Sequence, residues 1–289
     1  MRHSITSVLA AATVSTVASA GFLSLNLDAF ANGSAVQGGA YDQTAGGGQW
    51  WLPDNAATSG FFRAGQGRTG GTALAVGNRG NGSDGVITNI LTPRLANAAG
   101  SATGGNTYTQ FNSEYWVRTV PTSSNASFRF RSEVWGGLAD GGLDRTTFFG
   151  MQADANGGLY AFTFGGNAAG DNLEQANVAS SLTWGAWYRV TTSINYADGS
   201  LNFGTFATVT TSIFDASGTM LGQSIGRTWG TIWATTQPQV DRMSFQSRGG
   251  FTGDNAYVDG ISYGTTVIPA PGALAVLALA GFRSARRRG

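Results

Sequence analysis

The chain has 289 residues, of which 44 are glycine, 11% are charged, 11% are aromatic and none is cysteine. The aromatic content argues against a disordered chain, and the absence of a Gly-X-Y period argues against collagen. Without cysteine, the chain has no disulfide, no thiolate metal ligand and no cysteine nucleophile.

All 17 basic residues are arginines, and five of them lie in the terminal segments: Arg2, Arg283, Arg286, Arg287 and Arg288. The region between those segments holds the other 12 arginines against 16 acidic residues, which gives a net charge of −4. A mildly acidic body of this kind does not indicate a nucleic-acid partner.

The N-terminal segment has the features of a secretory signal. A positive start at Met1-Arg2-His3 precedes an apolar stretch from Val8 to Val17, and Ala18-Ser19-Ala20 supplies small residues for signal peptidase. This order predicts a signal peptide over residues 1–20. A second small-residue site, Ala29-Phe30-Ala31, leaves cleavage after Ala20 or after Ala31 open. The alternative is a buried N-terminal helix.

Residues 21–266 carry the period-two alternation of β-strands, and we take them as one domain. In the stretch 114–120, Tyr115, Val117 and Thr119 share one face. In the stretch 128–135, one predicted face is apolar and packs on a core, and the other is turned to solvent or to a groove. The apolar face comprises Phe128, Phe130, Ser132 and Val134, and the other comprises Arg129, Arg131, Glu133 and Trp135.

Further strands are predicted at Ala73–Val76, Val86–Leu91, Leu159–Phe164, Trp187–Ile194, Phe206–Phe214, Gln239–Phe245 and Ala256–Tyr263. The Asp198-Gly199 dipeptide is typical of a tight hairpin, because glycine adopts positive φ without steric cost. Many short strands at this spacing predict an all-β fold of two antiparallel sheets packed as a sandwich.

Three stretches of the body resemble concanavalin A-like, LamG-type domains. The segment from Trp187 through Asp198-Gly199 to Phe203 looks like their central hairpin, and Asp254–Tyr263 looks like their closing strand. The segment from Tyr41 to Trp51 fits their opening. The resemblance implies a jelly roll of two antiparallel sheets over most of residues 32–266. An immunoglobulin-like sandwich satisfies much of the same pattern.

The residue inventory argues against most catalytic mechanisms. The only histidine is His3 in the leader, and lysine is absent. The body therefore does not contain the residues that histidine- or lysine-based nucleophilic catalysis requires. Carboxylate-pair glycoside hydrolysis remains, with Glu114, Glu133 and Glu174 as the available glutamates. None stands in the Glu-x-Asp-x-x-Glu pattern of concanavalin-like glucanases, so we expect no enzyme.

Glycan binding is the sharper hypothesis for a site, because sugars stack on aromatic rings and hydrogen-bond to planar polar groups. The candidate residues share one predicted sheet face: Trp116, Arg118, Arg129, Arg131, Glu133 and Trp135. The alternative is a solvated face with cross-strand Arg–Glu pairs and a Trp covering the core. The partner implied by the hypothesis is an extracellular polysaccharide.

We expect no catalytic cofactor, and a structural calcium ion stays open. Oxygen ligands that calcium prefers occur in Gly-rich stretches, at Asp140, Asp144, Asp154, Asn156, Asp171, Asp254 and Asp259. No complete calcium loop is present, and Asp and Asn commonly stabilise turns instead.

The C-terminal residues 267–289 have three parts. Pro269-Ala270-Pro271 is followed by eleven apolar residues, Gly272 to Phe282, and then by Arg283, Arg286, Arg287 and Arg288. As a helix, the apolar run is about 16 Å long, roughly half of a bilayer core. The arginines hold the end in the cytoplasm while the body lies outside.

This tail resembles the PEP-CTERM sorting signal, which a membrane exosortase is thought to cleave. Ala270 stands where the usual Pro-x-Pro motif has Glu, so the tail departs from the pattern at this position. The resemblance implies transient insertion in the inner membrane and delivery to the cell surface. We therefore expect a non-catalytic structural or adhesive protein of the surface or extracellular matrix. A lectin-like glycan-binding module is the alternative, and a glycoside hydrolase comes third.

The sorting interpretation predicts that the mature surface protein lacks the residues beyond about Pro271. Mass spectrometry of the surface form measures this directly. A surface form that keeps the intact Arg-rich end would overturn the prediction.

Overall fold

The protein was analysed as a computed structural model. The structure describes residues 22–33, 60–78, 88–92, 110–120, 128–137, 143–154, 156–166, 173–195, 208–227, 239–247 and 253–266. The predicted signal peptide, the sorting tail, the Tyr41–Trp51 opening and the Asp198-Gly199 turn lie outside these ranges.

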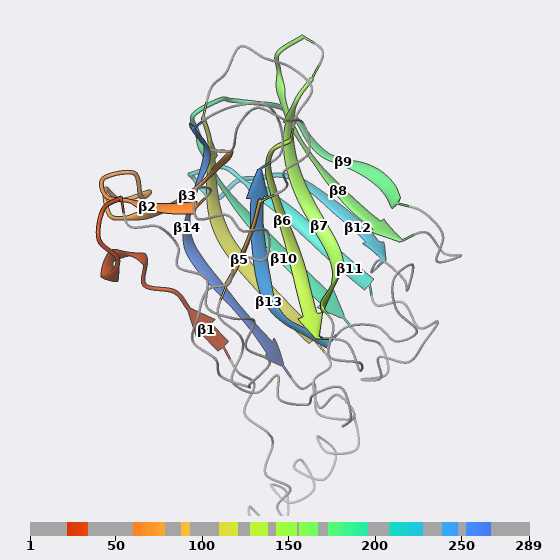
Figure 1. Ribbon diagram of the computed structural model, residues 1–289. Coiled ribbons are helices and arrows are strands. Elements are labelled where there is room, and N and C mark those ends of the chain that lie inside the picture. The colour runs from red at the N-terminus through yellow and green to blue at the C-terminus, as the bar shows by residue number, and fades with distance from the viewer. Residues whose placement is uncertain are drawn as a thin grey trace, which may run out of the picture.

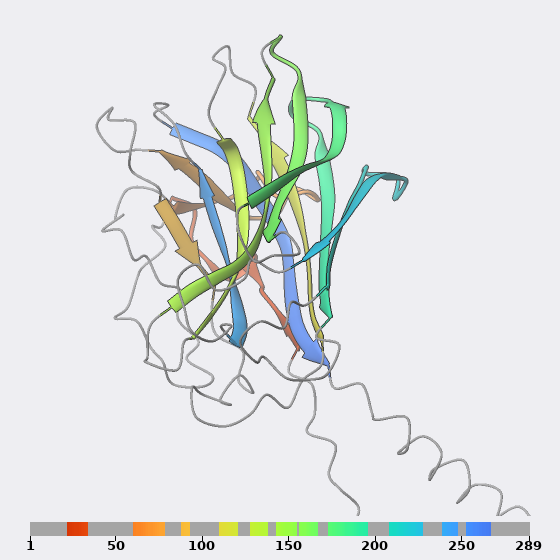
Figure 2. The same cartoon turned by 90° about the vertical axis from the view of Figure 1, so that its right-hand side faces the viewer.

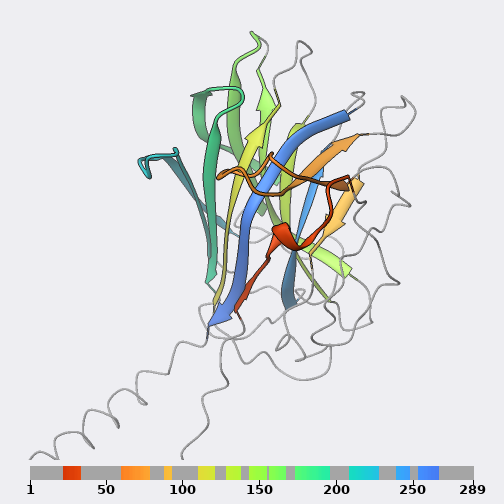
Figure 3. The same ribbon diagram turned by 90° about the vertical axis from the view of Figure 1, so that its left-hand side faces the viewer.

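The described residues form a sandwich of two antiparallel layers (Figure 1). In the first sheet the strand order is β2-β3-β14-β5-β10-β11-β12, and β1 pairs with β14. Its strands are β1 (Phe22–Ser24), β2 (Gly60–Arg63), β3 (Ala73–Asn78), β5 (Gln110–Thr119), β10 (Trp187–Asn195), β11 (Thr208–Phe214), β12 (Met220–Arg227) and β14 (Gly253–Thr266). A short 3-10 helix, η1 (Leu27–Ala29), follows β1 (Figure 3) and contacts β3.

The second sheet has the order β9-β8-β7-β6-β13-β4. Its strands are β4 (Thr88–Leu91), β6 (Phe128–Gly137), β7 (Leu143–Ala153), β8 (Leu159–Gly166), β9 (Leu173–Leu182) and β13 (Gln239–Ser247). One residue pair, Arg227 with Gly166, joins β12 to β8 along one edge. Seen from the side, the two sheets lie face to face (Figure 2).

The core fills the space between the sheets. Tyr115 of β5 lies among rings of the second sheet, with centroids 5.8 Å from Phe130 and 5.2 Å from Phe245. Its hydroxyl and the Ser132 hydroxyl share a hydrogen bond of 2.5 Å. Burial raises the pKa of the Tyr115 phenol, and the Ser132 bond opposes that rise only in part. This buried bond ties β5 to β6.

The edge between β12 and β9 closes by backbone contact. A Cβ atom built on Gly222 would lie 1.8 Å from the carbonyl oxygen of Val178. No side chain fits there, so glycine allows the first sheet to approach the second along this side.

The predicted two-sheet antiparallel sandwich is confirmed. The alternation expected in β5 is also confirmed, because Tyr115, Val117 and Thr119 are buried and the residues between them are partly exposed. The prediction missed three long strands, β7, β9 and β12, and the two short strands β1 and β2. In β7, Phe149, Gly150 and Met151 are all buried, so no alternation marks the strand. Strands β9 and β12 are rich in Ala, Ser or Gly, which have little strand preference.

Within the described ranges, the chain forms no helix with the length and hydropathy that a membrane span requires.

Replacing Tyr115 by Phe removes the hydroxyl that meets Ser132 and leaves the Ser132 hydroxyl buried without that partner. We expect a loss of about 1–3 kcal/mol in the free energy of unfolding, measured by urea denaturation. The double variant Tyr115→Phe with Ser132→Ala removes both polar groups and recovers most of the loss. A single variant as stable as the wild type would contradict a structural role for this bond.

Candidate functional site

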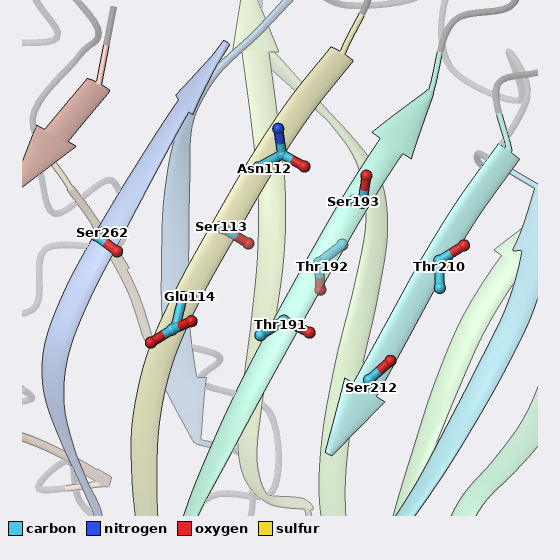
Figure 4. Close-up of a pocket in the computed structure, with 9 residues that line it drawn as sticks. All are labelled: Asn112, Ser113, Glu114, Thr191, Thr192, Ser193, Thr210, Ser212 and Ser262. Carbon is cyan, nitrogen blue, oxygen red and sulfur yellow. The ribbon is translucent and has the colours of Figure 1, made fainter. Parts of the chain in front are cut away.

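A shallow groove lies on the outer face of the first sheet, the side turned away from the core (Figure 4). Its volume is about 520 Å³. Four strands contribute to it: β14, β5, β10 and β11. The lining residues are Asn112, Ser113, Glu114, Thr191, Thr192, Ser193, Thr210, Ser212 and Ser262. Each of these residues carries a hydroxyl, amide or carboxylate group.

Strand register arranges the outward side chains of the groove in two rows. One row contains Glu114, Thr191 and Ser212, which are direct cross-strand partners. The second row, two residues along the strands, contains Asn112, Ser193 and Thr210. The rows are about 7 Å apart, because a strand rises about 3.4 Å per residue.

Small side chains make the groove, and neighbouring amides hold two of its hydroxyls in place. Gln110 Nε2 donates to Ser193 Oγ at 2.7 Å. Gln223 Nε2, on β12, donates to Ser212 Oγ at 2.9 Å. Each of these serines keeps its own proton and a lone pair for a further partner.

One charged side chain, Glu114, stands among the described lining residues. Its Oε2 atom is 3.8 Å from Nη1 of Arg189, and the Glu114 side chain is 43% exposed. The Arg189 guanidinium lies over the ring of Phe214, 4.4 Å from the centroid. The pair is solvent-screened, so Glu114 keeps oxygen atoms available at the groove surface.

Trp116 and Arg118, two of the predicted site residues, lie on this same face beyond the groove. The guanidinium of Arg68 sits over the Trp116 ring at 3.7 Å. Asp259 accepts a hydrogen bond of 2.8 Å from the Arg68 backbone N–H. The chain itself thus covers Trp116, and the stack anchors the loop 64–72.

Arg118 anchors the same loop. Its Nη2 donates to the side-chain oxygen of Gln66 at 2.7 Å, and its guanidinium lies near the rings of Trp187 and Tyr257 at 5.2 and 4.9 Å. Tyr257 donates to Asp254 Oδ2 at 3.2 Å. Burial, followed by the Asp254 carboxylate, raises the pKa of the Tyr257 phenol. Both predicted residues therefore have structural partners within the chain.

The second sheet carries the remaining predicted residues, and the expected exposure of Arg131 and Glu133 is wrong. Both are buried, at 7% and 0% exposure, and they form an ion pair through Arg131 Nη2 and Glu133 Oε1. Ser244 Oγ, across the strand pair, donates to Glu133 Oε2 at 3.4 Å. Alternation correctly placed Arg131 and Glu133 on the face of β6 opposite Phe130 and Ser132. It carries no information about how exposed that outer face is.

The structure does not bring the six predicted residues together. Since Tyr115 and Ser132 meet in the core, Trp116 and Arg118 point out of one side of the sandwich, and Arg131 and Glu133 out of the other. Strands β5 and β6 belong to different sheets and are not paired with each other, although they face each other across the core. The backbone of Arg129 and Trp135 lies in β6, and their side chains are outside the description.

Sequence reasoning missed the groove. Its signal was the concentration of hydroxyl residues in two runs, Thr191-Thr192-Ser193 and Thr208-Val209-Thr210-Thr211-Ser212. Such runs also suit any strand with one solvated face. Only the pairing of β10 with both β5 and β11 places the hydroxyls beside Asn112 and Glu114.

Within the described part of the chain, no group of three or more His, Cys, Asp or Glu side chains stands close enough to hold a metal ion. Three of the aspartates considered for calcium have protein partners. Asp154 accepts the backbone N–H groups of Asn156 and Gly158, each at 2.8 Å. Asp254 pairs with Arg63 at 3.1 Å, and Asp259 accepts from Arg68.

No protein-family model matches the sequence, and no curated protein matches it. Solved structures with similarity to the chain include a carbohydrate esterase from the Shiga toxin-encoding bacteriophage phi24B. It is 12% identical, with a TM-score of 0.46, over 75% of this chain and 90% of the other. At this level of similarity, the likeness supports no inference about ligand or activity.

Two further similar structures are a lectin and a carbohydrate-binding module. Peanut lectin is 12% identical, with a TM-score of 0.41, over 86% of this chain and 99% of the other. The CBM2 module of the evolved Dit of Lactobacillus casei BL23 phage J-1 is 12% identical, with a TM-score of 0.43, over 87% and 99%.

Removal of one partner of the buried Arg131–Glu133 pair is expected to destabilise the fold strongly. For Arg131→Met we expect a loss of about 3–5 kcal/mol in the free energy of unfolding, because Glu133 is left buried without that partner. The double variant Arg131→Met with Glu133→Leu replaces the pair by apolar groups and recovers most of the loss. Chemical denaturation of both variants measures this, and an Arg131→Met protein of wild-type stability would refute it.

Proposed function

We propose that the protein is an exported, non-catalytic surface or matrix protein that adheres by binding polysaccharide in the groove on the outer face of the first sheet. The observation that carries the proposal is the lining of the groove. Hydroxyl, amide and carboxylate groups from four strands converge there on a partly open surface. Polysaccharides offer the matching donors and acceptors at close intervals.

The rigidity of the groove supports binding. Its side chains project from paired strands in the middle of the first sheet, and Gln110 and Gln223 orient two of the serines. Short Ser and Thr side chains lose little rotamer freedom when a ligand settles on them. A pre-ordered polar surface therefore retains more of its gross interaction energy as affinity.

The arrangement of carboxylates supports binding without hydrolysis. Glycosidases need two carboxyl groups on either side of one sugar. Glu114 lies at the groove on one side of the sandwich, whereas Glu133 is buried on the other side and paired with Arg131. No second carboxylate is among the described lining residues.

Export and surface delivery are the second half of the proposal. They rest on the tail residues, Pro269-Ala270-Pro271 followed by the apolar run and the arginine cluster. In this proposal signal peptidase and an exosortase-type enzyme process the chain, and the tail contacts the inner membrane only in transit.

Filling the groove tests the binding proposal. Thr191→Tyr places a bulky side chain between Glu114 and Ser212, and we expect it to weaken polysaccharide binding at least about tenfold by steric exclusion. The melting temperature is expected to stay near that of the wild type, because tyrosine suits a half-buried strand position. Affinity electrophoresis in polysaccharide gels measures the loss.

Ser180→Tyr is the matched control, since Ser180 is exposed on β9 of the second sheet, away from the groove. This variant is expected to bind like the wild type. If the wild-type protein binds nothing on a glycan array, the adhesive role without glycan binding replaces this proposal.

A further inference from the structure

The groove crosses the strands. Its lining begins at Ser262 on β14 and continues through β5 and β10 to Ser212 on β11. The next strand, β12, extends the two rows, because Gln223 pairs with Ser212 and Ile225 pairs with Thr210. The four steps from β14 to β12 cover roughly 19 Å, since neighbouring strands lie about 4.8 Å apart.

Ile225 lies on β12, just beyond the lining on β11, and has a different chemistry from the groove. Ile225 is 68% exposed, more than Met220 and Leu221 of the same strand, which are 54% and 41% exposed. It lies on the same outward face as Thr210, directly beside the hydroxyl-rich lining. An apolar side chain at this point offers a contact for the C–H face of a sugar ring. The lining residues on β14, β5, β10 and β11 offer hydrogen bonds instead.

Glu114 determines the preferred charge of an occupant. It is the one charged residue in the described lining, and it is 43% exposed at the side chain. The Arg189 guanidinium, 3.8 Å away, is also stacked on Phe214 and lies outside the lining. A chain of uronic acids would bring further carboxylates next to Glu114, which like-charge repulsion disfavours.

We propose that the groove takes a neutral, unbranched chain of about four pyranose units lying across the strands from Ser262 to Ile225, one unit for each inter-strand step. This inference rests on the proposed function and names its ligand class and direction. The first units hydrogen-bond to Glu114 and Thr191 in one row, and the chain then crosses to Thr210 in the second row. The last unit packs its C–H face on Ile225, the cross-strand partner of Thr210.

Isothermal titration with neutral β-1,4-linked gluco-oligosaccharides, from disaccharide to hexasaccharide, tests the length of the site. We expect the affinity to rise about tenfold or more from disaccharide to tetrasaccharide and then to level off. Oligogalacturonates of the same lengths are expected to bind at least about tenfold more weakly. The variant Glu114→Gln keeps a planar hydrogen-bonding group but removes the negative charge. It is expected to reduce the difference in affinity between the neutral oligosaccharides and the oligogalacturonates.

Two variants on β12 test the end of the site. Ile225→Ser is expected to lower tetrasaccharide affinity about three- to tenfold and to leave disaccharide affinity unchanged. Leu221→Ser is the matched control, because Leu221 is also exposed on β12, at 41%, but lies outside the part of β12 paired with the groove rows. It is expected to bind both ligands like the wild type.

The possible failures are distinguishable. Equal affinity for disaccharide and tetrasaccharide, preference for the oligogalacturonates, or an Ile225→Ser variant that binds like the wild type overturns this inference and leaves the proposed function in place. Absence of binding to both neutral and acidic oligosaccharides overturns the proposed function, and this inference with it.

Discussion

The architecture depends on the contact of Tyr115 with the second sheet. Its ring packs against Phe130 and Phe245, and its hydroxyl meets Ser132 in a fully buried setting. A buried phenol hydroxyl is costly unless it is hydrogen-bonded, so this bond favours packing of the Tyr115 face of β5 on the Ser132 face of β6. In that packing, alternation directs Trp116 and Arg131 to opposite outer faces.

The two outer faces differ in how their charges are used. On the first sheet, Arg68 and Arg118 stack on aromatic rings and hold the loop 64–72, and the groove beside them stays open to solvent. On the second sheet, Arg131 and Glu133 are buried and paired. A buried pair is costly to break and offers little to a ligand, whereas partly exposed hydroxyls on a rigid sheet exchange water for ligand at low cost.

Much of the fold could be predicted from local pattern, and the failures have physical causes. Strands with one buried face, such as β5 and β10, alternate clearly and were found. Strand β7 is buried on both faces at Phe149, Gly150 and Met151, so its period disappears. The predicted site consisted mainly of Trp and Arg residues, because aromatic rings stack on sugars and guanidinium groups hydrogen-bond to them. In the structure, Trp116 is covered by Arg68, and serines and threonines line the groove instead.

The sequence by itself determined the all-β sandwich, the inward faces of β5 and β6, and the lack of histidine, lysine and cysteine chemistry in the body, because these follow from composition and the two-residue period of a strand. Only the tertiary structure decided that β5 and β6 lie in different sheets, that Glu133 is buried, and that Asn112, Ser193 and Thr210 stand side by side. Strand pairing joins residues far apart in the chain, and no local pattern encodes which strands become neighbours or what covers their outer faces.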